Sequence, residues 1–130
     1  MVDFVICLES SEEDIEEMRQ IATRDPASAK GNLFAINHTA YTPLLAQPIT
    51  ISVETKRPGE DWDTAQVQLG IWASAHLTRL EQLMRLAGNN QRLPVLPLIV
   101  IQGHEWNFLA ATREGFGKTV GCGGPQRTLD

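Results

Sequence analysis

The sequence contains few cysteines, and none are paired at a spacing typical of metal sites. Its 130 residues include only Cys7 and Cys122. Two cysteines cannot build a disulfide framework, and we expect both to stay reduced in the nucleus or cytoplasm. Cys7 lies in an apolar segment and is expected to be a small buried side chain. The sequence therefore excludes the disulfide-rich secreted class and cysteine-based zinc sites.

The sequence also lacks a long apolar run and the basic N-terminal segment of a secretory signal peptide. The longest apolar stretch, Val95 to Ile101, is interrupted by Pro97 and is far shorter than the roughly 20 residues that cross a membrane. The N-terminus, from Met1 to Phe4, has no basic segment before an apolar one and no small-residue cleavage site. We expect a soluble, intracellular protein that does not contact a membrane.

Basic residues are scarce as well. Eleven Lys and Arg against 16 Asp and Glu give a formal net charge of −5. Six of the acids lie between Glu9 and Glu17, and from Phe34 onward eight basic residues balance eight acidic ones. This acidic excess is one local face, which argues against tight non-specific DNA binding but allows a confined basic groove. The cations available for such a groove are Lys56, Arg57, Arg79, Arg85 and Arg92.

What remains is the composition of one globular domain, with 42 % apolar and 21 % charged residues. Alternating apolar and polar residues from Ile49 to Lys56 predict a strand, and the proline-free segment from about 62 to 87 predicts a long helix. The other expected elements are a buried strand over 2–8, a helix capped by Ser10 or Ser11, a central strand over 95–102 covered on both faces, and a strand over 105–112.

This order of elements predicts an α/β fold, with a mixed sheet flanked by helices and at least one crossover. From Gly115 onward the chain contains five glycines and little apolar periodicity. We therefore expect one domain over residues 1–118 and an irregular, glycine-rich tail over residues 119–130.

Glu54 and Lys56 are the first candidates for chemistry. Residues two apart in a strand point from the same face, about 7 Å apart, so a carboxylate and an ammonium group would lie together near the end of the strand. The same spacing also fits a surface ion pair, which contributes roughly 0–1 kcal/mol. The spacing alone does not decide between the two.

Asp3 and Gln68 favour the chemical interpretation. Asp3 starts an apolar strand, where a lone acid requires a partner or a cation. If that strand neighbours the one carrying Glu54, both carboxylates can hold one Mg²⁺ ion, with water and a substrate phosphate completing its shell. Gln68 lies four residues before Trp72 in the long helix, on the same face, where its amide can reach a water or a phosphodiester. A solvent-facing glutamine is the alternative.

Taken in order, these segments resemble a known family. Asp3 lies in Val-Asp-Phe-Val-Ile, Glu54 and Lys56 in Ile-Ser-Val-Glu-Thr-Lys, and Gln68 in Gln-Leu-Gly-Ile-Trp. The chain resembles the PD-(D/E)XK nuclease superfamily from about Val2 to Lys118, and within it the fungal nuclease-like domains. The Glu-x-Lys tripeptide is unspecific by itself, and the order of all four segments carries the resemblance.

The resemblance implies a restriction-endonuclease-like core that hydrolyses phosphodiester bonds with Mg²⁺, or with Mn²⁺. Asp3 and Glu54 would be metal ligands, Lys56 the catalytic lysine, and Gln68 a support for the substrate or the attacking water. Nucleic acid would be the partner, DNA in preference to RNA. Members of the group usually have a helix before the aspartate strand, whereas Asp3 here is the third residue, so we expect a shortened domain.

The other candidate residues and motifs fit structural roles better than catalytic or binding roles. His76 lies on the apolar side of the long helix and is expected to be half-buried, and His104 follows a strand at a turn. The Gly-Lys-Thr at Gly117–Thr119 lacks the upstream glycine of a phosphate loop and the helix after it. The three tryptophans lie in amphipathic elements and are expected to pack in or beside the core.

Two functions remain open at this point. The first is a metal-dependent nuclease that uses Asp3, Glu54, Lys56 and Gln68. The second is a catalytically inactive nuclease-like module that acts in protein interaction, with a partner domain or a second copy of the chain. The acidic balance and the short N-terminus favour the second, and the complete set of four residues favours the first.

Overall fold

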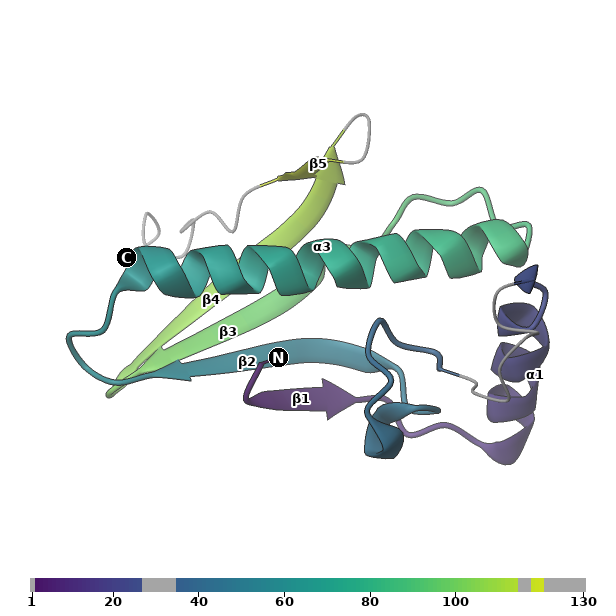
Figure 1. The fold of residues 1–130 in the computed structure, drawn as a ribbon, viewed down its shortest axis with the longest axis horizontal. Coiled ribbons are helices and arrows are strands. Elements are labelled where there is room, and N and C mark those ends of the chain that lie inside the picture. Colours follow the sequence, from purple (N-terminus) through teal and green to yellow (C-terminus); the bar gives the residue numbers. More distant parts are fainter. Residues whose placement is uncertain (1, 27–34, 115–117, 121–130) are drawn as a thin grey trace.

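The computed structural model describes residues 2–26, 35–114 and 118–120, and Figure 1 shows their arrangement. The elements in chain order are β1 (Phe4–Cys7), α1 (Glu12–Ala22), the short 3₁₀ helix η1 (Thr42–Leu44), β2 (Ile49–Lys56), α3 (Trp62–Leu86), β3 (Leu96–Gln102), β4 (Glu105–Glu114) and β5 (Lys118–Val120). No helix in this part of the chain has both the length and the apolar content needed to cross a membrane.

The described strands form one mixed sheet in the order β1-β2-β3-β4-β5. β2 and β3 are parallel, and α3 makes the crossover between them. The other neighbouring pairs are antiparallel. The predicted α/β fold, a mixed sheet with flanking helices as in restriction-endonuclease-like domains, is confirmed.

Both long helices begin at side-chain caps that the sequence contains. In α1, Ser11 accepts a hydrogen bond from the backbone N–H of Asp14, whose side chain accepts from the backbone N–H of Ser11 in return. In α3, Asp61 caps the first turn by accepting from the backbone N–H of Asp63. Gly88, at φ +69°, follows the C-cap of α3 in the left-handed conformation that glycine adopts without strain.

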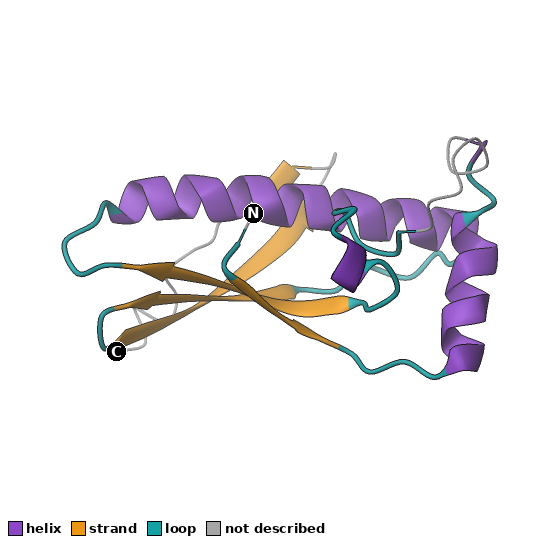
Figure 2. Cartoon of the chain, turned by 60° about the horizontal axis from the view of Figure 1, so that its bottom comes forward, coloured by secondary structure: helices purple, strands orange, loops and turns teal. Residues whose placement is uncertain are grey.

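The core lies between α3 and one face of the sheet. Figure 2 shows α3 running along this face. Leu69, Ala73 and Leu77 of α3 are fully buried, as is Val100 of β3. Leu98, at 1 % exposure, belongs to the same cluster. Burial of this kind contributes roughly 25 cal/mol per Å² of apolar surface, so the contact between α3 and the sheet holds the domain together.

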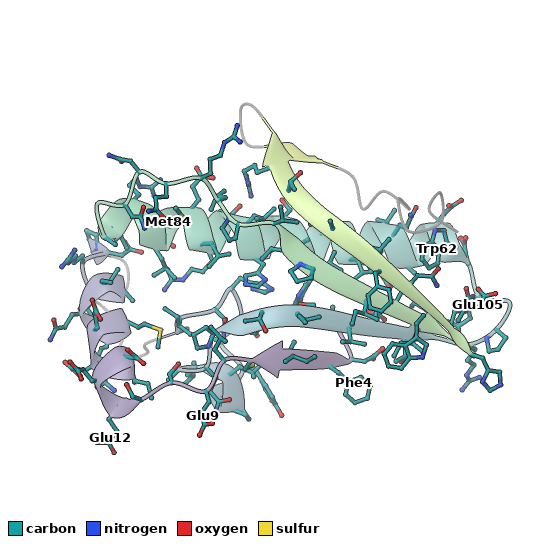
Figure 3. All side chains as sticks on the ribbon, turned by 180° about the vertical axis from the view of Figure 1, so that it is seen from behind. Phe4, Glu9, Glu12, Trp62, Met84 and Glu105 are labelled. Atoms are coloured by element: carbon teal, nitrogen blue, oxygen red, sulfur yellow. The ribbon has the colours of Figure 1, made fainter. Side chains whose placement is uncertain are left out.

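The opposite face of the sheet exposes large apolar side chains. Figure 3 looks onto it, with the strands in front of α3. Paired residues share a face, so Phe4 lies in one row with Val53, and Ile99 with Phe108. Exposures here reach 62 % for Phe4, 50 % for Ile6, 60 % for Trp106 and 57 % for Phe108.

Two predictions fail on this face. The strand predicted as buried over residues 2–8 is the edge strand β1, and Phe4 and Ile6 are exposed. The strand predicted to be covered on both faces is β3, in which Pro97 is exposed and Ile99 is half-buried. An apolar run shows that a strand is compatible with burial, and packing of the helices decides how many of its faces are buried.

The C-terminal region contains a short strand at a place where an irregular tail was expected. Residues 118–120 form β5, which pairs with β4 through Thr112 and Val120, Arg113 and Thr119, and Glu114 and Lys118. Threonine and valine are β-branched and suit a strand, and this preference prevails over the nearby glycines. Residues 121–130 lie outside the described part, and the division into 1–118 and 119–130 remains a prediction.

Candidate active site

The pairing of β1 with β2 brings two of the predicted site residues together. Phe4 pairs with Val53 in antiparallel register, and the backbone N–H of Asp3 donates to the Val53 carbonyl at 3.2 Å. Asp3 itself lies just before β1, outside the ladder, which begins at Phe4. The carboxylates of Asp3 and Glu54 nevertheless lie close enough for each to shift the pKa of the other, although 50 residues separate them.

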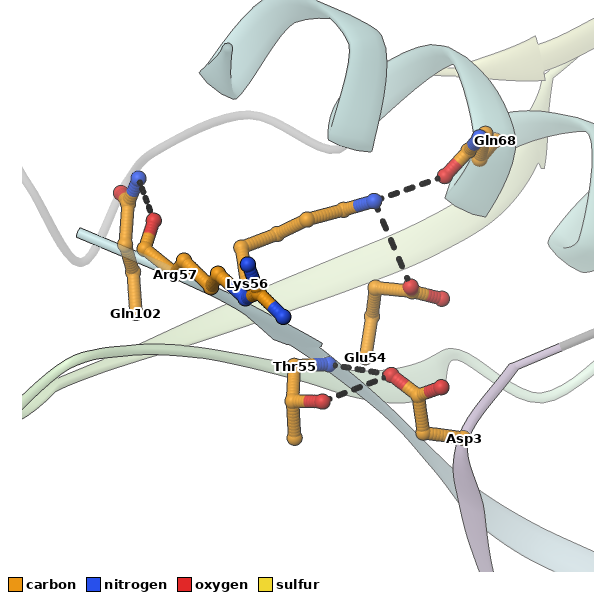
Figure 4. A network of polar contacts seen from close by, with 7 residues as sticks. All are labelled: Asp3, Glu54, Thr55, Lys56, Arg57, Gln68 and Gln102. Atoms are coloured by element: carbon orange, nitrogen blue, oxygen red, sulfur yellow. Dashed lines mark hydrogen bonds and ion pairs between the residues drawn. The ribbon is translucent and has the colours of Figure 1, made fainter. Parts of the chain in front are cut away.

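Thr55 holds the Asp3 carboxylate in place. The backbone N–H and the hydroxyl of Thr55 each donate to Asp3 Oδ2 at 2.8 Å, as Figure 4 shows. These hydrogen bonds, from the backbone first and the hydroxyl second, lower the pKa of Asp3 below its ordinary value. Asp3 is exposed, so the prediction that it lies in a buried setting is wrong, and Thr55 supplies the partner that was expected.

Glu54 occupies a different environment. Its exposure is 7 %, because it projects from β2 beneath α3. Burial raises the pKa of Glu54, the nearby Asp3 carboxylate raises it further, and Lys56 opposes both effects. A buried carboxylate beside a second carboxylate is costly when it is charged, and a cation placed between them would remove that cost.

Lys56 links the strand to the helix. Its Nζ lies 3.6 Å from Glu54 Oε1 and donates to Gln68 Oε1 at 3.1 Å, and Figure 4 shows both contacts. The side chains of Lys56 and Glu54 are only 17 % and 10 % exposed. The ion pair of the alternative interpretation is therefore present, but it lies in a partly enclosed place where charges interact more strongly than in water.

A hollow of about 410 Å³ opens beside these groups. The structure thus brings all four predicted residues into one neighbourhood: Glu54, Lys56 and Gln68 line the hollow, and Asp3 lies beside Glu54. The remaining wall is apolar or aromatic and comes from Val2 and α3. The full lining is Val2, Glu54, Lys56, Gln68, Ile71 and Trp72.

The donor set fits a hard divalent cation that keeps much of its own water. Within the described residues, no group of three or more His, Cys, Asp or Glu side chains lies together. Two carboxylates are nevertheless enough for Mg²⁺, which is commonly held by one or two carboxylates with water and substrate phosphate. Asp3 and Glu54 are the residues that would hold it.

Sequence reasoning missed several polar contacts around this site. The Thr55 hydroxyl was not expected to orient Asp3, although a threonine between Glu54 and Lys56 was visible. The indole N–H of Trp72 donates to Ser52 Oγ at 2.8 Å, and Ser52 is 1 % exposed. This hydrogen bond joins α3 to β2 near the hollow, and it could not be found from the sequence because it depends on how the helix lies on the sheet.

One of the predicted nucleic-acid cations is engaged inside the protein. Arg79 is half-buried; one of its guanidinium nitrogens donates to the Ala35 carbonyl and another to Gln82 Oε1. Arg79 therefore stabilises the fold, and the prediction that it contributes to a basic groove for nucleic acid is wrong. Arg57, Arg85 and Arg92 are exposed.

Two histidines far apart in the sequence stack on each other beside the hollow. The ring of His38 lies 4.8 Å from that of His76 and 4.1 Å from that of Trp72, edge to face. His76 was expected to be half-buried and is 3 % exposed. Burial first, and the neighbouring His76 second, lower the pKa of His38 to about 4. Burial lowers the pKa of His76 as well, so both rings pack as neutral groups.

We expect acid to destabilise the domain through His38. Its pKa in the folded chain is about 4 against about 6.5 when unfolded. The unfolded chain therefore binds more protons between these values, and stability falls as the pH is lowered from 6.5 towards 4. Because the ring is only partly buried, we expect a loss of about 1–2 kcal/mol.

Thermal unfolding measured between pH 7 and pH 4 checks this expectation. His38→Phe keeps an aromatic ring against Trp72 but cannot titrate, so its melting temperature should fall less over that range than that of the wild type. The carboxylates contribute equally to both proteins and cancel in the comparison. Parallel curves for the two proteins would contradict the expectation.

Comparison with known proteins gives one result. The family model described as the PD-(D/E)XK nuclease superfamily matches residues 1–129. No curated protein and no solved structure matches the chain.

Proposed function

Because the chain belongs to the PD-(D/E)XK nuclease superfamily, we propose that it is a Mg²⁺-dependent nuclease that hydrolyses phosphodiester bonds of nucleic acid at the hollow beside Glu54. Family membership implies nucleic acid as the substrate and a divalent metal ion as the usual cofactor of such enzymes. The observation that carries the proposal for this chain is the meeting of Asp3, Glu54, Lys56 and Gln68 at one hollow.

The charges at the hollow explain why a metal ion is needed. Asp3 and Glu54 supply two negative charges and Lys56 supplies one positive charge, so a phosphodiester would be repelled by the bare site. A bound Mg²⁺ would polarise the phosphoryl oxygens and lower the pKa of a coordinated water. The low pKa of Asp3 keeps this carboxylate ionised and ready to bind a cation.

The chain's own residues would then orient the reaction. In hydrolysis a water oxygen bonds to phosphorus, the bond to the leaving oxygen breaks, and the proton lost by the water balances the one gained by the leaving group. Lys56 Nζ, fixed by Gln68 at 3.1 Å, would donate to the attacking water or to a phosphoryl oxygen, where negative charge develops. Gln68 keeps the lysine directed into the hollow.

A thermal-shift titration with Mg²⁺ tests the metal site directly. A ligand at one hundred times its Kd stabilises a protein by about 2.7 kcal/mol, so the wild-type melting temperature should rise by several degrees. Glu54→Gln should lose this rise. Without metal its melting temperature should equal or exceed that of the wild type, because the raised pKa of Glu54 means that its ionised form destabilises the fold in spite of the ion pair with Lys56.

Glu17→Gln is the matched control, since it removes an exposed carboxylate on α1. It should respond to Mg²⁺ like the wild type. If the wild type shows no shift at any Mg²⁺ or Mn²⁺ concentration, or if Glu54→Gln retains the full shift, the proposed metal site is wrong.

The exposed face of the sheet favours a second candidate, a catalytically inactive module for protein interaction. Phe4, Ile6, Trp106 and Phe108 are each at least half exposed, and exposed apolar patches of this kind often mark interaction surfaces. A chain that neither responds to metal nor cuts nucleic acid would support this candidate over the nuclease.

A further inference from the structure

A second hollow, of about 450 Å³, lies next to the first. The two share Gln68, Ile71 and Trp72 as a common wall. The second is otherwise lined by the loop before η1 and by the next turn of α3. Its full lining is His38, Thr39, Ala40, Gln68, Ile71, Trp72 and Ala75.

The second hollow differs from the first in its chemistry. The first contains Glu54 and Lys56, whereas the lining of the second has no charged side chain, because burial keeps His38 neutral near pH 7. Ile71 is 68 % exposed and presents an apolar edge between the two. An uncharged wall with apolar and aromatic sides suits a flat, uncharged group and offers nothing to a phosphate.

The wall also holds hydrogen-bonding capacity that the described residues do not use. Both ring nitrogens of His38 are buried, and neither has a hydrogen-bond partner within the described part of the chain. A neutral imidazole has one donor and one acceptor, and leaving them unpaired costs free energy. A ligand edge that carries both a donor and an acceptor could satisfy them after a small movement of the ring.

A nucleobase meets all of these requirements. It is flat and uncharged, and its edge carries donors and acceptors. We propose that the second hollow holds an unpaired nucleobase from the nucleotide next to the phosphodiester at Lys56, so that the substrate is single-stranded or locally opened nucleic acid. The inference rests on the proposed function, because it assumes that the phosphodiester lies in the first hollow. A base inside a duplex is stacked and paired, and it would have to be extruded before it could enter.

Ala75→Leu tests the inference because Ala75 lines only the second hollow. Ala75 is an exposed helical position, leucine is a good helix former, and the larger side chain would fill the space intended for the base. Ala87→Leu makes the same change at the exposed C-cap of α3, outside both hollows, and serves as the control.

Fluorescence anisotropy with labelled ten-nucleotide strands gives the readout, with Ca²⁺ in place of Mg²⁺ to slow cleavage. The wild type should bind single strands more tightly than the matching duplex, and DNA and RNA strands are compared side by side. Ala75→Leu should weaken single-strand binding about tenfold, the effect of losing one base contact. Ala87→Leu should bind as the wild type does.

Strands carrying one abasic nucleotide locate the contact. At one position along the strand, removal of the base should weaken wild-type binding, and Ala75→Leu should cause no further loss there. The inference is overturned if Ala75→Leu binds like the wild type, if the duplex binds as tightly as the single strand, or if the wild type binds no single strand. A Mg²⁺ thermal shift in Ala75→Leu equal to that of the wild type separates failure of this inference from failure of the metal site.

Discussion

Lys56→Met should lower the rate constant of Mg²⁺-dependent cleavage by about a thousandfold. The substitution keeps most of the stem of the side chain but removes the ammonium group beside Glu54 and Gln68. A donor directed at developing charge, or at the attacking water, typically contributes a factor of this size. The measurement is the initial rate of plasmid and oligonucleotide cleavage at saturating substrate.

The control for this variant is Arg19→Met, which removes one positive charge from α1, outside the hollow. It should cleave at the wild-type rate, which shows that the effect of Lys56→Met does not come from net charge. The melting temperature of Lys56→Met without metal should stay near or below that of the wild type, since Lys56 offsets the charge of Glu54. Cleavage by Lys56→Met at the wild-type rate would contradict the assigned role.

The second large effect is expected at Asp3. Asp3→Asn removes one of two carboxylates from a site that has no others close by in the described residues, so cleavage at a fixed Mg²⁺ concentration should fall at least about a hundredfold. Part of the lost cleavage activity should be recovered as the Mg²⁺ concentration is raised, because weakened metal binding can be compensated by mass action. Cleavage rate measured against Mg²⁺ concentration checks both expectations.

Thr55→Val gives a graded version of the same test. It removes the hydroxyl that donates to Asp3 at 2.8 Å but keeps the backbone donor, and loss of such a supporting hydrogen bond typically costs 10–100-fold in metal affinity or activity. Asp63→Asn, an exposed carboxylate in the first turn of α3, should change nothing. If Asp3→Asn has an unaltered Mg²⁺ dependence, Asp3 is no ligand.

The two carboxylates are adapted to different tasks by their surroundings. Thr55 keeps the pKa of Asp3 low, and burial under α3 keeps the pKa of Glu54 high. Glu54 therefore costs stability in the metal-free chain and gains most from a cation. A site that destabilises the protein until its ligand binds is common where function and stability conflict. For this reason, one Mg²⁺ titration of Glu54→Gln separates the effect of Glu54 on metal binding from its effect on stability.

Several elements were predictable because their patterns are local. The alternation from Ile49 to Lys56 predicts β2, and the cap at Asp61 with the periodic residues after it predicts α3. Glu54 and Lys56 lie two apart on β2, so their common face follows from strand geometry alone. Gln68 lies on a helix whose position after β2 follows from the short connection between them.

The surroundings of these residues were not predictable in the same way. Asp3 was expected to be buried and is exposed, and Arg79 was expected to be available for nucleic acid and is bonded within the fold. The stack of His38 on His76 joins residues 38 positions apart. Each of these depends on which residues meet in space, and no local pattern specifies that.

By itself, the sequence determined β1 to β4, α1 and α3, their order, and the four residues suited to metal and phosphate chemistry, because caps, periodicity and side-chain chemistry act over a few neighbouring positions. Only the tertiary structure decided that β1 pairs with β2, which brings Asp3 against Thr55 and near Glu54, and that α3 covers one face of the sheet and leaves the other exposed. Pairing and packing are chosen by the free energy of the whole chain, in which distant segments compete for the same partners.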